Sequence, residues 1–349
     1  MTPAAPAAPA AKAPKAAPAT TPGIGLDIGT MNLVAARRTG GGVEHTRLRD
    51  AFLDLPPSAK KMLKLSKTSF VERGDDILIL GDAALQTANV FGKEARRPLS
   101  AGLISAGELE AMEVLGLMIK QILGPPSVPH EHCYFSVPAA PIDQPGRDVI
   151  YHKGVFERIV TECGYTGTPS NEAMAIIYSE CANDGFSGIA LSFGSGMTNI
   201  ALAINTIEGL AFSVARGGDW IDSGASRAIG STQARICAIK EKGVDLLKPA
   251  DREQEAISFY YKELIRYALD QIALRFAQIR GQFELPDAIP LIISGGTSLA
   301  VNFVELFKQE FERRRKKFPV LVSEIRHASD PMNAVANGML TQAMLEHEE

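Results

Sequence analysis

The chain has 349 residues and a mass of 37.4 kDa, a length that suits two large domains better than one small one. Its hydrophobic fraction of 46% and charged fraction of 22% exclude a wholly disordered chain, a collagen-like chain and a disulfide scaffold. With 36 basic against 40 acidic residues, the net charge of −4 gives no general attraction for nucleic acid. No segment approaches the roughly 18 apolar residues of a membrane-spanning helix. The four cysteines lack metal-ligand spacing, so they fit reduced thiols in a cytoplasmic protein.

Residues 1–22 differ in composition from the rest of the chain. They form an Ala/Pro tract with two lysines and no aromatic or branched apolar residue. Repeated prolines interrupt any helix, and the tract has no apolar surface to bury against the entropy of ordering. The composition predicts a flexible, extended tail or spacer. The alternative is a tether with weak affinity for an anionic partner.

From Gly23 onward, strand and helix patterns alternate, which is typical of the α/β class. Apolar runs predict strands at 23–30, 32–38, 76–80, 133–138, 290–293 and, as a pair with a Gly-rich turn between them, 188–205. Helical periodicity predicts helices at 107–123, 152–164, 222–242, 253–281 and 299–317, with others opening near 81, 171 and 330. The helix at 107–123 is expected to share one face among Leu109, Met112, Leu115, Ile119 and Ile122.

An internal repeat is the most informative pattern in the sequence. Ile24, Leu26, Gly29 and Thr30 recur 165 positions later as Ile189, Leu191, Gly194 and Ser195, and Asn32 has an echo in Asn199. Each copy predicts a β-hairpin whose turn carries glycine and hydroxyl residues. Such turns suit phosphate oxygens, because small residues allow close approach and unpaired backbone N–H groups converge on the anion. Two copies therefore indicate two related halves that face a shared cleft.

Five motifs in this order resemble those of the actin-like ATPase superfamily, which includes actin, the bacterial actin MreB, plasmid-segregation actins and the ATPase domain of heat-shock chaperones. They are GLDIGTMN (25–32), NEAMAIIY (171–178), LSFGSGMTN (191–199), IISGGTS (292–298) and DPMNAVANG (330–338). Three further stretches, at 80–85, 96–104 and 216–222, are closer to MreB and the chaperones than to actin. The resemblance covers residues 23–345.

The resemblance implies a two-lobed fold with duplicated ribonuclease H-like halves around a nucleotide cleft. The first lobe is expected at 23–168, with a small outer subdomain at about 40–110. The second lobe is expected at 169–349, with an outer subdomain at about 217–290.

The same resemblance assigns roles to individual residues around ATP or ADP with Mg²⁺. Asp27 is expected beside the metal, and Glu172 is expected to polarise the attacking water, at a helix start that favours a carboxylate. The alternative for Glu172 is a simple first-turn charge beside the helix cap Asn171. The other residues expected to bind nucleotide are Gly29, Thr30, Met31, Asn32, Ser192, Gly194, Ser195, Gly196, Met197, Thr198, Gly217, Gly218, Asp219, Lys240, Gly295, Gly296 and Asp330. Lys240 and its neighbour Glu241 are equally consistent with solvated helix charges.

Ser192 departs from the family pattern, which places an aspartate at the opening of the second phosphate loop. Serine still forms hydrogen bonds, but it brings no charge to the metal. Losing one group that positions the water lowers a rate by about 10²–10⁴, by analogy with general-base contributions. The sequence therefore predicts nucleotide binding with slow hydrolysis, that is, a weak ATPase.

The function implied by the resemblance is that of an MreB-like, filament-forming cytoskeletal or scaffolding protein. Its expected partners are ATP, further copies of itself and an unidentified protein or cargo. The main alternative is a nucleotide-binding adaptor that does not polymerise, as in pilus-assembly or chaperone-like relatives. A sugar or acetate kinase is disfavoured, because no catalytic aspartate is located. Residues 51–57 are interpreted either as a filament contact loop or as cover for the local sheet, and the basic run at 313–317 either as a helix-end charge cluster or as an acidic-partner site.

Overall fold

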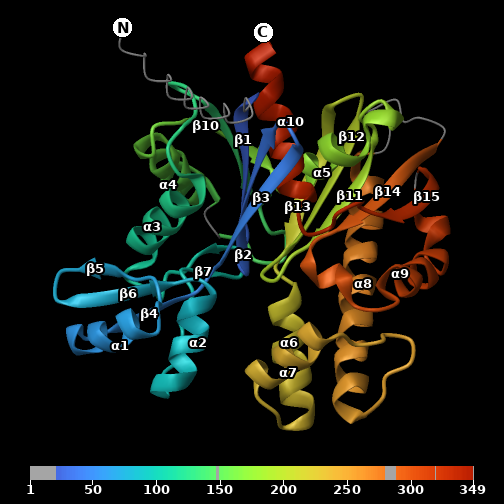
Figure 1. Cartoon of the computed structure of the whole chain (residues 1–349). Coiled ribbons are helices and arrows are strands. Elements are labelled where there is room, and N and C mark those ends of the chain that lie inside the picture. The colour runs from blue at the N-terminus through green and yellow to red at the C-terminus, as the bar shows by residue number, and fades with distance from the viewer. Residues whose placement is uncertain (1–20, 147–148, 280–287, 319, 349) are drawn as a thin grey trace, which may run out of the picture.

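Two five-stranded sheets, one in each lobe, form the centre of the molecule in the computed structural model (Figure 1), which describes residues 21–146, 149–279, 288–318 and 320–348. The strands are β1 (Thr21–Ile28), β2 (Asn32–Thr39), β3 (Gly42–Arg49), β4 (Phe52–Leu55), β5 (Val71–Arg73), β6 (Asp76–Leu80), β7 (Leu99–Ser100), β8 (Leu103–Ile104), β9 (His132–Val137), β10 (Thr166–Asn171), β11 (Gly188–Phe193), β12 (Thr198–Ile204), β13 (Ile207–Val214), β14 (Ala288–Ser294) and β15 (Leu321–His327). The helices are α1 (Lys60–Leu65), α2 (Asp82–Phe91), α3 (Ala111–Leu123), α4 (Val149–Glu162), α5 (Glu172–Glu180), α6 (Gly218–Ile229), α7 (Gln233–Lys242), α8 (Arg252–Ile279), α9 (Phe303–Glu312) and α10 (Ala334–Glu348), with 3₁₀ turns η1 (Pro57–Ala59), η2 (Ala182–Asp184), η3 (Gly296–Leu299) and η4 (Arg315–Lys317).

The two sheets have the same topology, which confirms the two related halves expected from the internal repeat. The first has the order β10-β9-β1-β2-β3 and the second β13-β12-β11-β14-β15. In each, an antiparallel three-stranded meander is extended by two parallel strands next to its first strand. The central strand β11 is buried at every position, because elements cover both faces of its sheet, and its composition GIALSF is apolar apart from Ser192.

Helix α10 lies between the two sheets (Figure 1) and contacts β1 of the first lobe and α5 of the second. Two glycines allow this close approach. A Cβ atom on Gly25 of β1 would lie 2.1 Å from the Ala336 carbonyl oxygen, and one on Gly338 of α10 would lie 1.8 Å from the Ala175 carbonyl oxygen. Only glycine fits such backbone-to-backbone contacts, so α10 touches both lobes along its main chain.

Each lobe carries a smaller outer part at the same end of the molecule (Figure 1). In the first lobe it is the three-stranded sheet β4-β6-β5 with α1 and α2, and in the second it includes α6 and α7. Residues 51–57 belong to the first of these parts. Phe52, Leu53 and Leu55 are buried in it, so they cover the local sheet and are not available as a contact loop.

Three predicted helices differ from those observed. The helix expected from residue 107 begins at Ala111, and Leu109 before it is 97% exposed, so the buried face comprises Val114, Leu115, Met118, Ile119 and Ile122. The helix expected at 222–242 is two helices, because Gly230 adopts a left-handed conformation that ends α6. Only 303–312 of the helix expected at 299–317 is α-helical.

The Ala/Pro tract falls almost wholly outside the described residues, since β1 begins at Thr21. Within the described part of the chain, no helix has both the length and the apolar character needed to cross a bilayer.

Candidate functional site

A cavity of about 390 Å³ opens between the lobes, a size typical of small-ligand sites. Its walls come from both halves of the repeat. The first lobe contributes the β1–β2 turn and Arg49, and the second contributes the β11–β12 turn, the start of α6, part of α7 and the β14–η3 turn. The cleft predicted from the two glycine turns is therefore a real cavity in this structure.

The two turns have the same backbone geometry. Gly29 N–H donates to the Asn32 carbonyl at 3.1 Å, and Gly194 N–H donates to the Met197 carbonyl at 2.9 Å. A third turn joins them, since Gly102 N–H between β7 and β8 donates to Thr30 Oγ1 at 3.1 Å. A Cβ atom on Gly196 would lie 2.2 Å from the Gly102 nitrogen, so these turns meet at backbone distance. The segment 101–102 thus belongs to the site, although no site residue was predicted there from the sequence.

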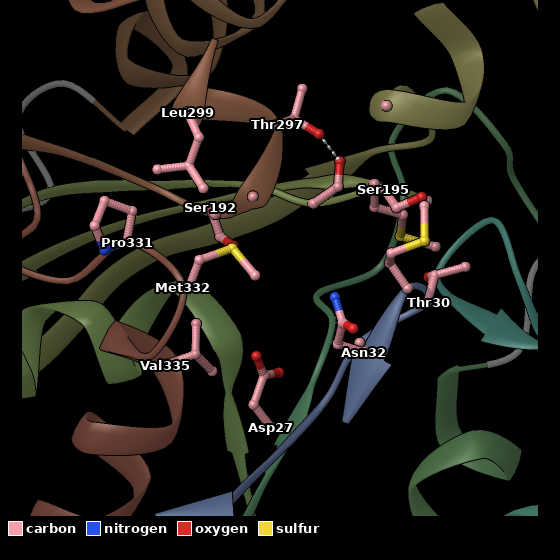
Figure 2. A pocket seen from close by; sticks show the side chains of 18 of the residues that line it. Asp27, Thr30, Asn32, Ser192, Ser195, Thr297, Leu299, Pro331, Met332 and Val335 are labelled. Carbon is pink, nitrogen blue, oxygen red and sulfur yellow. Dashed lines mark hydrogen bonds between the residues drawn. The ribbon is translucent and has the colours of Figure 1, made fainter. Parts of the chain in front are cut away.

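Two half-buried carboxylates face the cavity. Asp27 ends β1 and points inward (Figure 2), and its Oδ1 accepts a hydrogen bond from Ser136 Oγ at 2.9 Å. Glu172 begins α5 after the Asn171 cap, whose side chain accepts the amides of Ala173 and Met174. Ser192 Oγ donates to Glu172 Oε1 at 2.6 Å, and Asn199 Nδ2 donates to Glu172 Oε2 at 2.8 Å. Both oxygens of Glu172 are therefore held by neutral donors.

Burial dominates the protonation of this pair. It raises the pKa of Glu172 to about 8, with a further increase from the nearby Asp27 and a decrease from the Ser192 hydrogen bond. It raises the pKa of Asp27 to about 6, against the lowering effects of Ser136 and Arg47. In the absence of a cation, the pair does not carry two full negative charges near neutral pH. A positive ion in the cavity would restore them.

Charged side chains at the rim of the cavity are paired across the lobes or within the second lobe. Arg97 of the first lobe donates to Asp219 at 3.0 Å, and Ser195 Oγ donates to the same carboxylate at 2.7 Å. Arg49 at the end of β3 donates to Glu241 at 2.8 Å. Two ion pairs therefore bridge the lobes at this rim.

Lys240 of α7 is also paired, within the second lobe. Its Nζ lies 2.9 Å from Asp222 Oδ1 and donates to the Gly218 carbonyl at 2.8 Å. Its exposed fraction is only 11%, so it is not the solvated helix charge that the sequence left open.

One side of the cavity is apolar. Leu299, Pro331, Met332 and Val335 line it opposite the polar side chains of Thr30 and Ser195 (Figure 2). Thr297 Oγ1 donates to the Gly194 carbonyl at 2.9 Å, which ties the β14–η3 turn to the second glycine turn. An elongated ligand with an apolar end and an anionic end fits this division.

Most of the predicted site residues line the cavity. They are Asp27, Gly29, Thr30, Met31, Asn32, Glu172, Ser192, Gly194, Ser195, Gly196, Met197, Gly218, Lys240, Gly295 and Gly296. Four others lie just outside its lining: Thr198, Gly217, Asp219 and Asp330. Thr198 donates to the Arg216 carbonyl, and Asp330 accepts from Met332 and Asn333 at the start of α10. Their roles toward a nucleotide stay predictions.

Several lining residues were missed from the sequence. Asn199 had a signal in its repeat relation to Asn32, and Gly102 lay in a stretch noted only for its resemblance. Thr297 lies in the 292–298 motif, and Pro331, Met332 and Val335 lie in the 330–338 motif, although none of them was singled out. Others had no local signal, because only the fold brings them to the cavity: Pro138, Cys237, Tyr261 and Leu299.

The donor set fits Mg²⁺ held together with phosphate rather than by protein alone. Among the described residues, no group of three or more His, Cys, Asp or Glu side chains is placed to hold a metal ion. Mg²⁺ is usually bound by one or two carboxylates, with phosphate oxygens and water completing its shell. Asp27 supplies one such carboxylate, and the three glycine-containing turns leave room for phosphates at backbone distance.

Comparison with known proteins agrees with the fold. A family model described as Volactin matches residues 23–343. Among curated proteins no relative was found. A solved structure, "MamK double helical filament", superimposes with a TM-score of 0.70 at 18% identity, covering 93% of this chain and 98% of that one.

Two other solved structures share the fold. MreB 5 of Spiroplasma citri, bound to AMPPNP, gives a TM-score of 0.64 at 15% identity, with 95% of this chain and 98% of that one covered. The ethanolamine utilization protein EutJ from Carboxydothermus hydrogenoformans gives 0.52 at 14% identity, covering 92% and 89%. These likenesses show the actin-like fold.

Proposed function

The chain belongs to the Volactin family, and from this premise and the geometry of the cleft we propose that it binds adenine nucleotide with Mg²⁺ and assembles into filaments. The observation that supports this most strongly is the cavity between the duplicated halves, with matching glycine turns on both sides and two half-buried carboxylates lining it. The structures of MreB 5 bound to AMPPNP and to ADP support nucleotide binding by this fold.

Different parts of the cavity would bind different parts of the nucleotide. The glycine turns would receive the phosphates, the apolar wall would receive the base, and Asp27 would hold Mg²⁺. When bound, the metal supplies positive charge that neutralises the phosphates. Glu172 would accept a proton from, and orient, the attacking water. Because Ser192 is neutral, the second glycine turn brings no carboxylate of its own to the metal and its water, and hydrolysis would be slow.

Isothermal titration calorimetry with ATP and ADP, each with and without Mg²⁺, tests the binding. We expect saturable binding that weakens without the metal. Absence of binding at millimolar nucleotide would remove the proposal. Asp27→Asn should weaken the Mg²⁺-dependent part, whereas Asp184→Ala, in the second lobe away from the cavity, should leave binding unchanged.

Assembly is supported by the filament likeness and by exposed apolar side chains in the outer part of the first lobe. Leu65 of α1 and Val90 of α2 are 77% and 75% exposed there, in contrast to the buried Phe52, Leu53 and Leu55. Sedimentation and negative-stain electron microscopy at tens of micromolar protein, with ATP, ADP or no nucleotide, test it. We expect filaments that depend on nucleotide. A monomer in all three conditions would favour the adaptor function.

A further inference from the structure

The 138–143 loop, which follows β9 in the first lobe, docks on the edge strand β13 of the second lobe. Ser213 on β13 donates its N–H to the Ala140 carbonyl at 3.2 Å and accepts the Ile142 N–H at 3.0 Å. Ser213 Oγ also donates to the Ala139 carbonyl at 2.8 Å. The loop thus adds a short strand-like pairing to the second sheet, which is a contact between lobes separate from α10.

Asp143 secures the far end of this loop. Its Oδ1 accepts the Ala215 N–H at 2.8 Å, and its Oδ2 accepts the Tyr267 hydroxyl of α8 at 3.2 Å. Both partners belong to the second lobe. Movement of the lobes relative to each other would therefore either break these hydrogen bonds or move the loop together with the second lobe.

Asn199 connects the docked loop to Glu172. Its Nδ2 donates to Glu172 Oε2 at 2.8 Å, and its Oδ1 accepts the Ala139 N–H at 3.2 Å. Asn199 is 2% exposed, so water does not substitute for either partner. Glu172 Oε2 accepts from this amide and the Ala139 backbone N–H only donates to it, which sets a single orientation of the amide. No other residue type of this size offers one donor and one acceptor in that arrangement.

We propose that Asn199 is a positioning residue for hydrolysis, which aims Glu172 at the attacking water only while the 138–143 loop is docked on the second lobe. The inference rests on the proposed nucleotide function. One side chain, Asn199, thereby links the docking of the lobes to the orientation of the Glu172 carboxylate. Glu172 itself does not have to move with the first lobe. In open lobes Asn199 would lose the Ala139 N–H that fixes the orientation of its amide, so the direction of its hydrogen bond to Glu172 would no longer be set.

Single-turnover hydrolysis of γ-labelled ATP by the full chain tests the proposal, with nucleotide affinity measured separately. Misplacing a reacting group by about 1 Å costs on the order of 10² in rate, so Asn199→Ala should lower kcat about 10- to 100-fold and change KM by less than about threefold. Asp143→Ala, which lies outside the cavity, should lower kcat about 3- to 10-fold. Asp143→Asn should restore it to within about twofold, because an amide keeps both hydrogen bonds. Asp184→Ala serves as the control.

The double variant Asn199→Ala with Asp143→Ala distinguishes a shared route from two separate effects. If both act through Glu172, the double variant should match Asn199→Ala alone. Multiplying effects would overturn the proposal, as would an Asn199→Ala defect confined to KM. Hydrogen exchange over residues 138–143 checks the docking without using activity. We expect faster exchange in Asp143→Ala, and unchanged exchange there would also overturn it.

The outcomes separate this inference from the proposed function. A chain that binds no nucleotide fails the proposed function. A chain that binds ATP but releases no phosphate within a day overturns the positioning role and leaves nucleotide binding in place. Circular dichroism of each variant establishes folding, and the Asp143→Asn and Asp143→Ala pair keeps the test informative if Asn199→Ala does not fold.

Discussion

Replacing Glu172 with glutamine should stabilise the nucleotide-free chain at pH 8 while removing hydrolysis. Burial and Asp27 raise the pKa of Glu172 from 4.5 to about 8 in the folded protein. A carboxyl whose folded pKa is raised favours folding below its unfolded pKa. That contribution is lost as pH rises from about 4.5 to about 8. Glutamine has no charge to bury, so the loss should be absent in the variant.

The size of the effect follows from the shift and from the hydrogen bonds. A shift of this size corresponds to at most about 5 kcal/mol, at 1.36 kcal/mol per pKa unit. Part of it is shared with Asp27, whose own pKa is raised. Glutamine can keep its oxygen toward Asn199 only if its N–H₂ group faces Ser192, whose hydroxyl must then rotate to accept, and we assign this rearrangement a cost of about 1–3 kcal/mol. A net gain of about 2 kcal/mol at pH 8 remains.

Thermal unfolding without nucleotide or Mg²⁺, at pH 5.5 and pH 8, measures this difference in stability between Glu172→Gln and the wild type. We expect the melting temperature of Glu172→Gln to exceed that of the wild type by a few degrees at pH 8 and to fall to or below it at pH 5.5. Glu131→Gln is the matched control. The backbone N–H groups of Ser127 and Gly23 hold the pKa of Glu131 below its usual value against desolvation, so the stability it contributes is fully present at both pH 5.5 and pH 8, and Glu131→Gln should lower the melting temperature by the same amount at both. Equal destabilisation of Glu172→Gln at both pH values would refute a protonated Glu172.

Three further predictions use other parts of the structure. Ser192→Asp should raise ATP turnover with Mg²⁺ but lower the melting temperature of the nucleotide-free chain at pH 8, because it adds a third carboxylate; lower turnover would contradict our interpretation of the second turn. Glu310→Ala should destabilise the chain by about 1–3 kcal/mol in urea unfolding, since it removes the buried carboxylate shared by Arg266 and Arg314 while each keeps one other acidic partner, and no measurable loss would be inconsistent with this. Deleting residues 1–20 should leave the melting temperature and ATP affinity unchanged, as β1 begins at Thr21; a loss of several degrees would mean that the tail docks on the body.

The fold was predictable because the same strand-and-glycine-turn pattern occurs twice in the sequence. Leu26 and Leu191 occupy corresponding buried strands, and the glycine turns that follow them recur with the same spacing. Element ends were less predictable. Leu109 fits the helical periodicity but precedes the helix and is exposed, since periodicity alone does not locate the first hydrogen-bonded turn.

The site was predictable where it is contiguous in sequence and unpredictable where folding assembles it. Asp27 and Glu172 were identified from motifs, and both line the cavity. Pairings across the lobes have no local signature. Nothing near Arg97 indicates Asp219 as its partner, and nothing near Asn199 indicates Ala139, because each contact depends on how the lobes pack.

The glycine contacts of α10 make this helix a spacer of fixed thickness between the lobes. Its Ala336 carbonyl bears on Gly25 of one lobe, and Gly338, about half a turn later, bears on Ala175 of the other. A side chain at position 25 would push the helix toward α5, where position 338 has no room to yield. The two positions are therefore coupled by geometry, and a variant tolerated at one should require a compensating change at the other. Such a compensating pair would show that these two residues, 313 positions apart in the sequence, together set the distance between the lobes.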